Sequence, residues 1–464
     1  MKILLRRLIV PFSLCIFLCP PVVNAQVKPF KSGDRVAFMG NSITHAGYYE
    51  SYVWLYYMTH FPEEKIRVFN VGTGGDVVGQ MNARFDGDLL PLKPNVMFLT
   101  FGMNDSGYFE FLKPDSNETA KQRVEKSRLG FDTIRRKMAA QNGMRKIIMS
   151  SSPYDETMKN KDNYFPGKSR ALEQIVAFQQ RAAQDEKWEY VDLYHPMQAI
   201  NKQQQQRDPA YTLTGPDRIH PGKAGHLVMA ALILKAQGLA GKPVANVEID
   251  ARKKHTVRSE NAEISQLAIA KDSLSFAYLA GSLPFPIDSN STAWGNPQKQ
   301  SDALAVYPFI REFDQEIIRV QGLAKGTYTV LIDQKPVAQC SADSLSKGLN
   351  LAVIGNTPQY MQAQSVMHLN DLRAELEGKM REYYWLQFNY FKGIGKLFDD
   401  SPEALKRVRE KAKTDGFVNS KMGVYETARF PEIRQMWNLN MDALIEQIYT
   451  LNKPVSHRIT IRRT

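Results

Sequence analysis

The chain has 464 residues, of which 43% are hydrophobic and 23% charged, and its formal net charge at pH 7 is +12. This composition excludes a disordered protein, because so many apolar side chains can bury a core in two or three domains. The positive charge is scattered along the sequence, so it predicts no nucleic-acid partner. Only Arg458, Arg462 and Arg463 cluster, at an end of the chain that we expect to be loose.

The first 25 residues have the pattern of a signal peptide. Three basic residues precede an apolar run from Leu8 to Val23, and the small residue Ala25 offers a cleavage site. Prolines interrupt the run, which is short for a membrane span of about 20 residues, so we expect no stable membrane insertion. Leucine precedes both cysteines of this segment, where a lipid-attachment site needs a small residue. The sequence therefore predicts a free periplasmic or secreted protein.

Short apolar runs alternate with longer segments of helical character in the first half of the chain. The expected strands cover residues 35–39, 66–70, 96–101, 146–150 and 189–193, and a last helix is expected over about 222–237. Such alternation predicts an α/β domain in which helices cover both faces of a parallel sheet. We assign this three-layer, flavodoxin-like domain to residues 26–240.

The pattern of apolar residues along the sequence changes after residue 240. Short alternating runs and turn signals, such as a strand over 327–333 before a turn at 334–336, predict a small antiparallel β-rich domain over 241–356. A helical period returns in the C-terminal region, 357–464, where two further helices are expected before the terminus. The apolar side of its first helix holds Met361, Val366, Leu369, Leu372 and Leu376.

Polar and glycine-rich segments follow the first three expected strands. They are Gly40-Asn41-Ser42, Gly72-Thr73-Gly74-Gly75-Asp76 and Gly102-Met103-Asn104-Asp105. Ligands of open α/β sheets bind beyond the carboxyl ends of the strands, so these three loops should share one rim. Ahead of the last helix, Asp217 and His220 place a carboxylate and an imidazole three residues apart in one loop.

These residues supply the parts of a serine hydrolase. A serine hydroxyl becomes a nucleophile when a base takes its proton and a third group holds that base, which are roles for Ser42, His220 and Asp217. The negative charge that develops on the carbonyl oxygen needs preorganised donors. The backbone amides of Ser42 and Gly75 and the side-chain amide of Asn104 are the candidates for this oxyanion hole.

The same four blocks resemble the SGNH hydrolase superfamily, also called GDSL-like esterases. Its pattern is a Gly-Asp-Ser start, a glycine after strand two, a Gly-x-Asn-Asp block and a late Asp-x-x-His. They occur here, in order, as Gly40-Asn41-Ser42, Gly75, Gly102 to Asp105 and Asp217 to His220. Asn41 replaces the usual aspartate, from which we expect altered loop support rather than lost activity. The resemblance covers about residues 30–240 and implies a carboxylic ester hydrolase. The C-terminal half looks like the extensions of bacterial members that act around polysaccharide breakdown.

Each candidate residue also has a structural interpretation. Ser42 and Asp217 are residue types that cap helices, and Asn104 and Gly75 suit turns without any catalytic role. We favour catalysis because the serine, the asparagine and the histidine occur together at the expected strand ends. The polar residues beside Ser42, namely Asn41, His45, Asp76 and Asp105, are expected to line a substrate cleft.

Glycine-rich segments do not predict a nucleotide site. A dinucleotide motif that starts at Gly72 would need a glycine at position 77, which is Val77, and Gly393-Ile394-Gly395-Lys396 lacks the rest of a phosphate loop. No histidine, cysteine or carboxylate cluster has metal-ligand spacing. We expect neither a cofactor nor a metal.

Three functions fit these observations. The first is an esterase that removes acetyl or similar small acyl groups from a polysaccharide or oligosaccharide, which the family resemblance favours. The second is a lysophospholipase-like lipid acyl hydrolase, although the sequence shows no apolar stripe for a long acyl groove. The third is a non-catalytic carbohydrate-binding protein on a hydrolase scaffold, against which Ser42, Asn104 and His220 argue. The sugar, the oligomeric state and the role of residues 241–464 stay open.

Overall fold

The computed structural model describes residues 27–160, 162–293 and 295–464. The expected signal peptide lies outside these residues. The N-terminal part is an α/β domain whose five strands are all parallel, in the order β2-β1-β3-β4-β5. The strands are β1 (Arg35–Gly40), β2 (Arg67–Gly72), β3 (Val96–Thr100), β4 (Arg145–Met149) and β5 (Glu189–Val191). The predicted parallel sheet is therefore confirmed.

Helices cover both faces of this sheet. They are α1 (Ser42–His45), α2 (Tyr49–His60), α3 (Val78–Arg84), α4 (Ser116–Ala139), α5 (Lys168–Asp185), α6 (Tyr194–Gln205) and α7 (Lys223–Ala236). Side chains alternate between the faces of a strand, so Phe38 packs in the same core as α2 and α7, whereas Met39 packs with α3, α4 and α5. The two faces give two separate cores. The loops after β1, β2 and β3 meet at one edge, as expected for parallel strands.

A β-rich domain follows the α/β domain. One sheet has the order β15-β12-β6-β7 and the other β14-β13-β16-β9-β8, and their inner faces enclose a common apolar core. The strands are β6 (Ala245–Asp250), β7 (His255–Glu260), β8 (Ala262–Ile269), β9 (Ser273–Ala280), β12 (Glu316–Gln321), β13 (Thr327–Ile332), β14 (Lys335–Ser341), β15 (Leu349–Asn350) and β16 (His457–Arg463). Two short helices, α8 (Phe309–Phe313) and α9 (Ala342–Lys347), lie within this part of the sequence.

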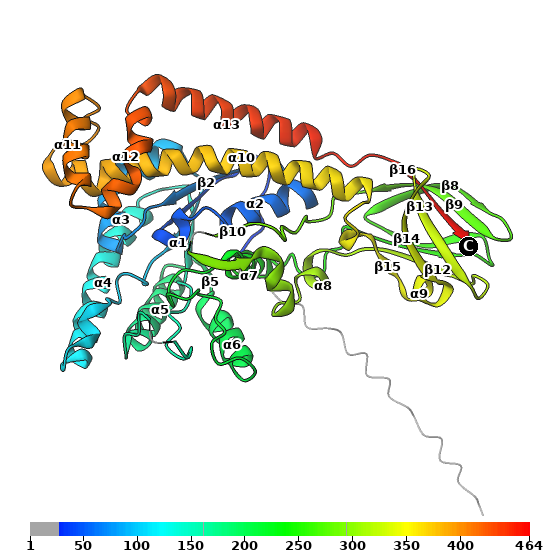
Figure 1. The fold of residues 1–464 in the computed structure, drawn as a ribbon, viewed down its shortest axis with the longest axis horizontal. Helices are drawn as coiled ribbons and strands as arrows, with labels where there is room; N and C mark the ends of the chain where they lie inside the picture. The colour runs from blue at the N-terminus through cyan, green and yellow to red at the C-terminus, as the bar shows by residue number, and fades with distance from the viewer. Residues whose placement is uncertain (1–26, 161, 294) are drawn as a thin grey trace, which may run out of the picture.

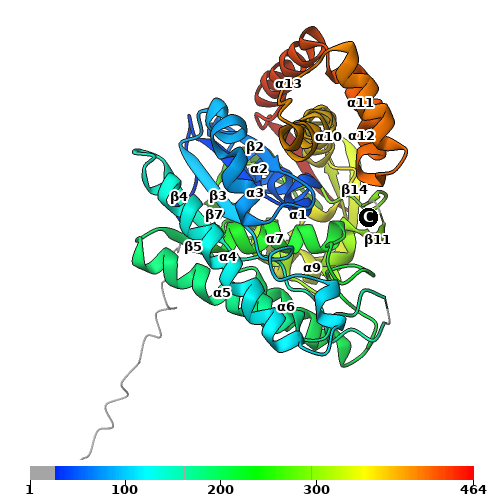
Figure 2. The same cartoon turned by 90° about the vertical axis from the view of Figure 1, so that its left-hand side faces the viewer.

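The C-terminal helices pack on the α/β domain. Helix α10 (Pro358–Leu386) begins near the β-rich domain and runs along the α/β domain, and α13 (Pro431–Leu451) lies beside it (Figure 1). In Figure 2, α10 is seen close to end-on between the α/β domain and the outer helices α11 (Pro402–Ala412), α12 (Gly416–Ala428) and α13. Every residue of α2 is buried, because α10 and α13 cover the side of α2 that the sheet leaves open. The C-terminal helices are thus part of the same packed body.

Four details differ from the sequence expectations. Three helices follow α10, not two, and Leu372 in its expected apolar stripe is half exposed beside α13. The terminus that we expected to be loose is β16, which pairs with both β13 and β9, because Ile459 and Ile461 alternate with polar residues and enter the β core. The hairpin of β10 (Thr292–Ala293) and β11 (Asn296–Lys299), within the expected β-rich segment, reaches back to α7.

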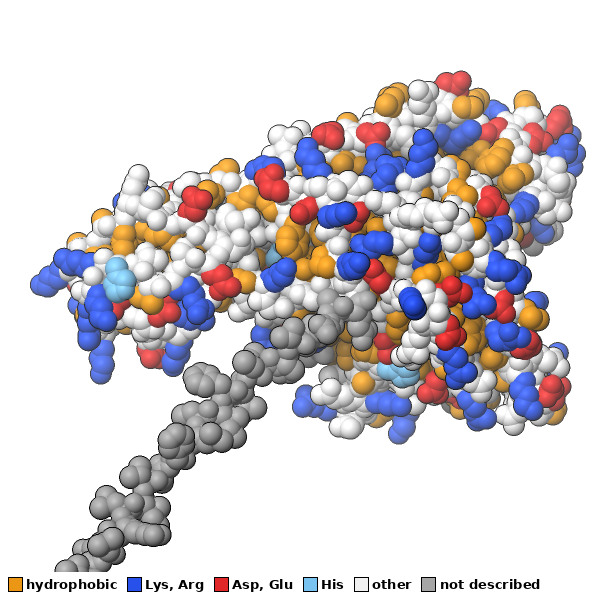
Figure 3. Space-filling view, turned by 180° about the vertical axis from the view of Figure 1, so that it is seen from behind, with side chains coloured by type: hydrophobic (Ala, Val, Ile, Leu, Met, Phe, Trp, Pro, Cys, Tyr) orange, Lys and Arg blue, Asp and Glu red, His pale blue; other side chains and the backbone are white. Residues whose placement is uncertain are grey.

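Charges are mixed on the surface. On the face drawn in Figure 3, lysine and arginine side chains are interspersed with acidic ones, and they do not gather over one element. Among the helices of the described residues, none combines the length and the apolar character that crossing a membrane requires.

Candidate active site

Ser42 lies at the turn between β1 and α1. It is the first residue of α1, and the side chain of Asn41 caps that helix by accepting the Ile43 amide hydrogen at 3.0 Å. Gly40 must lack a side chain here, because a Cβ would lie 2.1 Å from Thr44 Oγ1. The strand-to-helix turn presents the Ser42 hydroxyl at the carboxyl edge of the sheet.

His220 and Asp217 complete a hydrogen-bonded chain with Ser42. His220 Nε2 is 2.8 Å from Ser42 Oγ, and His220 Nδ1 is 2.5 Å from Asp217 Oδ2. The other oxygen of Asp217 accepts the backbone amides of Ile219 and His220, both at 2.9 Å. Burial alone raises the pKa of Asp217, but the hydrogen bond and charge of His220 and the two amides outweigh it and hold the pKa below its ordinary value. Asp217 therefore stays ionised and keeps the proton of His220 on Nδ1.

The loop that carries this pair is anchored from two directions. Arg218 is fully buried and donates to four backbone carbonyls, including those of Asp155 at 2.8 Å and Met158 at 3.0 Å. Asn296 of β11 donates to the carbonyl of His220 at 3.2 Å. The His220 side chain itself is 47% exposed, so the site opens to the solvent.

The expected oxyanion donors share this edge. Among the described residues, the backbone amides of Ser42 and Gly75 donate to no other protein group. Gly75 has a φ of +87°, a left-handed conformation that glycine adopts without strain. Asn104 Nδ2 donates to the Asp76 carbonyl at 2.9 Å, which occupies one of its two hydrogens, and Asn104 Oδ1 accepts the Tyr108 hydroxyl at 2.6 Å. The amide plane of Asn104 is thus held at both ends.

Lys168 supports the Asn104 loop from inside. Its Nζ is buried and donates to the carbonyls of Met103 and Gly107 and to Ser106 Oγ, each at 2.6 Å, and it lies 3.9 Å from the centre of the Tyr108 ring. Burial lowers the pKa of Lys168 well below its ordinary value. The sequence reasoning missed this residue, because nothing near position 168 indicates a contact with residues 103–108.

The polar residues beside Ser42 do not line a cleft as expected. Asn41 and Asp105 are buried, and Asp105 accepts the amides of Val78 and Gly102 at 3.0 Å, so it fastens the Asn104 loop to α3. Asp76 is fully buried against Arg84, at 2.6 Å. Each finds its partners inside the protein, which a short polar side chain near a loop can do as readily as face solvent. The structure thus turns these three side chains toward internal partners, and their substrate-binding role stays a prediction.

His45 supports the glycine loop rather than substrate. Its Nδ1 accepts the backbone amide hydrogen of Gly74 at 3.0 Å, and its Nε2 lies 3.6 Å from Glu382. Burial, followed by the charges of Arg381 and Lys421, lowers the pKa of His45 to about 3, so the ring stays neutral and can accept this bond.

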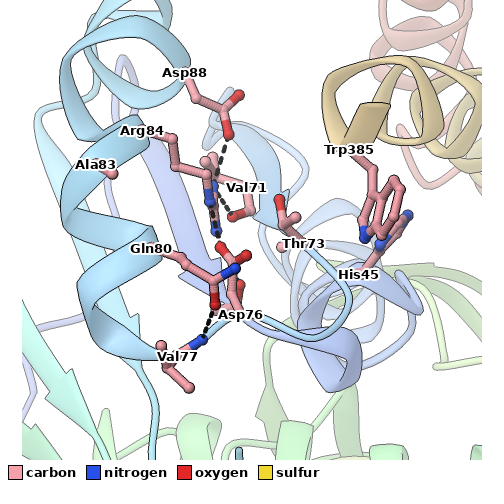
Figure 4. A network of polar contacts seen from close by, with 12 residues as sticks. His45, Val71, Thr73, Asp76, Val77, Gln80, Ala83, Arg84, Asp88 and Trp385 are labelled. Atoms are coloured by element: carbon pink, nitrogen blue, oxygen red, sulfur yellow. Dashed lines mark hydrogen bonds and ion pairs between the residues drawn. The ribbon is translucent and has the colours of Figure 1, made fainter. Parts of the chain in front are cut away.

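A buried network of charges that includes Arg381 of the C-terminal helices reaches the same loop. Arg84 pairs with Asp88 and with Asp76, both at 2.6 Å (Figure 4). Asp88 is also paired with Arg381 of α10, at 2.7 Å. Trp385 of α10 lies beside His45 in this view and donates to the Gly74 carbonyl at 2.8 Å. The sequence offered no signal for these residues.

In the described ranges, no group of three or more histidine, cysteine, aspartate or glutamate side chains is arranged to hold a metal ion.

Two family models match the chain. The model of the GDSL-like lipase/acylhydrolase family matches residues 38–228, and the model of the diltiazem deacetylase C-terminal helical domain matches residues 364–453. The first match spans the blocks that carry Ser42, Gly75, Asn104 and His220, and the second spans most of α10 to α13.

Individual relatives agree with these matches. The solved structure of a gut microbial diltiazem-metabolizing enzyme is 43% identical to this chain, covers 95% of this chain and 99% of its own, and superimposes with a TM-score of 0.92. An acetylxylan esterase from Geobacillus stearothermophilus is 25% identical over 222 residues, which are 45% of this chain and 95% of that protein. An uncharacterized lipoprotein from Bacillus subtilis is 27% identical over 128 residues, which are 26% of this chain and 50% of that protein.

Proposed function

Because the chain belongs to the SGNH, or GDSL-like, hydrolase superfamily and is a carboxylic ester hydrolase, we propose that it removes acetyl groups from esters with Ser42 as its nucleophile. The observation that carries the proposal is the hydrogen-bonded chain from Ser42 through His220 to Asp217, beside the backbone amides of Ser42 and Gly75, which have no acceptor among the described residues.

The proposed reaction has two halves. Ser42 Oγ attacks the acyl carbon while its proton passes to His220 Nε2, and Asp217 stabilises the imidazolium that forms. The amides of Ser42 and Gly75 and the second hydrogen of Asn104 Nδ2 receive the oxyanion. The intermediate collapses, the alcohol leaves with the proton of His220, and acetyl stays on Oγ. Water, deprotonated by His220, then releases acetate and restores Ser42.

Two of the comparisons support acetyl as the acyl group. One of them is an acetylxylan esterase, and the family model that matches α10 to α13 is named for a diltiazem deacetylase. For the alcohol side we propose acetylated oligosaccharide or polysaccharide, because the α/β domain resembles the acetylxylan esterase and the catalytic groups lie at an open edge that a polymer can approach.

An acetylated aromatic alcohol is a second candidate substrate. Phe417 of α12 is 68% exposed and stacks against Trp385, with ring centres 6.2 Å apart, and Trp385 contacts the loop of Gly75. An exposed ring at this place can stack with an aromatic leaving group. The 43% identity to a diltiazem-metabolizing enzyme, which extends over the helical region, favours the same candidate.

One assay separates these substrates. Released acetate is measured for acetylated xylooligosaccharides, for diltiazem and for a lysophospholipid, with the wild type and with Phe417→Ala. We expect acetate from the first two, and a greater loss for diltiazem than for the sugar on Phe417→Ala. Fatty acid released from the lysophospholipid without acetate from any acetyl ester would contradict the proposal and favour the lipid hydrolase.

We also propose that the enzyme acts outside the cytoplasm, as a periplasmic or secreted protein. The basic and apolar pattern of residues 1–25 supports this. Fractionation of the native cells, with N-terminal sequencing of the recovered protein, is expected to find it outside the cytoplasm and beginning at Gln26. Recovery of the full-length chain from the cytoplasm would contradict this.

A further inference from the structure

The loop from Gly72 to Asp76 carries one expected oxyanion donor and holds another. It presents the amide of Gly75, and the Asp76 carbonyl accepts the side chain of Asn104 at 2.9 Å. The orientation of this loop therefore affects two of the three donors together. Hydrogen bonds to other groups of the loop fix this orientation.

One hydrogen bond acts on the peptide group that contains the Gly75 amide. The carbonyl of Gly74 and the N–H of Gly75 belong to a single planar trans peptide, so they point in opposite directions and rotate together. Trp385 Nε1 donates to this carbonyl at 2.8 Å. By fixing the carbonyl on one side of the plane, the indole fixes the N–H on the other side. Accepting that bond also polarises the peptide and strengthens its N–H as a donor.

Arg381 holds the beginning of the same loop, one helical turn before Trp385. Its Nε donates to the Gly72 carbonyl and one Nη donates to Thr73 Oγ1, both at 3.0 Å. Residues four apart lie on one face of a helix, so α10 presents both side chains to the loop. The Arg381 side chain is buried, and both oxygens of Asp88 accept from it, at 2.7 and 2.8 Å.

The network continues from Asp88 to the strand that carries the nucleophile. Arg84 pairs with Asp88 and Asp76 and donates to the Gly40 carbonyl at 3.0 Å, at the end of β1 (Figure 4). Two arginines and two aspartates thus alternate in a buried row that is neutral overall. Paired buried charges resist displacement, because moving one leaves another without a partner.

Helix α1 also holds the loop, through a side chain that lies beside Trp385 (Figure 4). His45, three residues after Ser42, accepts the Gly74 amide hydrogen. The peptide groups on both sides of Gly74 are therefore fastened, one to the helix of the nucleophile and the other to α10.

We propose that Trp385 and Arg381 of α10 are positioning residues for the oxyanion hole, Trp385 by orienting the Gly75 amide and Arg381 by holding Gly72 and Thr73. The C-terminal helices would then be part of the catalytic apparatus and not only a brace for the fold. This inference rests on the proposed function, since it assigns the loop a role in the Ser42 reaction.

The test compares Trp385→Phe with a matched control. Phenylalanine keeps an aromatic ring against Phe417 but has no N–H for the Gly74 carbonyl. Trp437→Phe makes the same substitution on α13, at a ring that lies against Lys379 and forms no hydrogen bond with the loop in the described residues, and it is expected to keep wild-type kinetics. Steady-state hydrolysis of 4-nitrophenyl acetate gives kcat and KM, and inhibition by phenylboronic acid reports the tetrahedral state, because its adduct on Ser42 places a boron-bound oxygen in the oxyanion hole.

For Trp385→Phe, kcat is expected to fall about 5- to 50-fold, less than the ~10²–10³-fold that follows outright loss of an oxyanion donor. KM should change less than about threefold, and the affinity for phenylboronic acid should fall by the factor seen in kcat/KM. A purely structural role predicts a lower thermal midpoint with unchanged kcat for the molecules that remain folded. Unchanged kcat, or a change confined to KM, would overturn the inference.

Two further variants keep the result interpretable. Thr73→Val removes the hydroxyl that accepts from the Arg381 guanidinium at nearly constant volume. A drop in kcat of about two- to fivefold at constant KM is expected, less than the full strength of a charged hydrogen bond, because this bond acts on the oxyanion hole only through the loop. If Trp385→Phe does not fold, this variant decides, and an unchanged kcat overturns the inference. Ser42→Ala is measured in parallel. If Ser42→Ala retains turnover, the proposed function fails; if it is inactive while Trp385→Phe and Thr73→Val match the wild type, only the positioning role fails.

Discussion

Asn104→Ala is expected to slow the chemical step without weakening substrate binding. The Nδ2 of the side chain that is removed has two hydrogens, of which one is donated to the Asp76 carbonyl at 2.9 Å and the second is available to the oxyanion. Losing such a donor lowers kcat by about 10²–10³-fold, or about 2.7–4 kcal/mol of transition-state stabilisation. KM should change little, since the bond strengthens as charge develops on the oxygen.

A second variant, at a residue that holds Asn104, should have a smaller effect. Tyr108→Phe removes only the hydroxyl that Asn104 Oδ1 accepts at 2.6 Å, and it keeps the ring over Lys168. A neutral hydrogen bond contributes about 1 kcal/mol, so kcat is expected to fall about fivefold, well short of the Asn104→Ala effect.

Both variants are assayed on 4-nitrophenyl acetate, with thermal unfolding as the check of the fold. The reasoning is refuted if Asn104→Ala changes KM alone or loses less than tenfold in kcat. Equal losses in the two variants would mean that Asn104 is held by Tyr108 but donates nothing to the oxyanion.

Three further outcomes are expected. On nitrophenyl esters below their micelle threshold, kcat/KM should fall at least tenfold from acetate to octanoate, because forcing extra methylenes into a small acyl site costs about 1–3 kcal/mol; a steady rise, at ~0.8 kcal/mol per methylene, would instead indicate a lipid groove. Burial raises the pKa of Glu316 from 4.5 to about 7, so between these pH values the folded protein keeps a proton that the unfolded chain releases. The free energy of unfolding therefore falls as the pH rises through this interval. Glu316→Gln should match the wild-type thermal midpoint at pH 5 and exceed it at pH 8. Ile461→Ala in β16 should lower the free energy of unfolding, measured in urea, by about 2–5 kcal/mol, and a change within about 0.5 kcal/mol would mean that the terminus is loose.

The sequence was sufficient for the α/β domain and the main catalytic candidates. Apolar runs and helical segments alternate in the order of the parallel sheet, and the loops after β1, β2 and β3 meet because parallel strands end at one edge. Ser42 and His220 are 178 positions apart, yet each follows from its place in a recognisable local block.

What the sequence could not indicate depends on partners far along the chain. Arg381 and Trp385 lie about 310 positions from the loop that they hold, and nothing in a helical period reveals which turn meets which loop. Polarity near Ser42 likewise does not say whether a side chain faces solvent or an internal partner, which is why Asp76 and Asp105 were assigned to the wrong surroundings. The strand at the terminus did leave a signal, the alternation of Ile459 and Ile461 with polar residues, which the cluster of arginines obscured.

Ser42→Ala tests the central claim most directly. The hydroxyl lies on a half-buried turn at 2.8 Å from His220 Nε2 and carries little packing, so the variant should fold with a thermal midpoint close to that of the wild type. Turnover of 4-nitrophenyl acetate should fall by several orders of magnitude, toward the ~10⁶-fold seen when a triad serine is removed, and a fluorophosphonate should label Ser42 alone in the wild type and nothing in the variant. A folded Ser42→Ala protein with activity within tenfold of the wild type, or a label on another serine, would contradict the account.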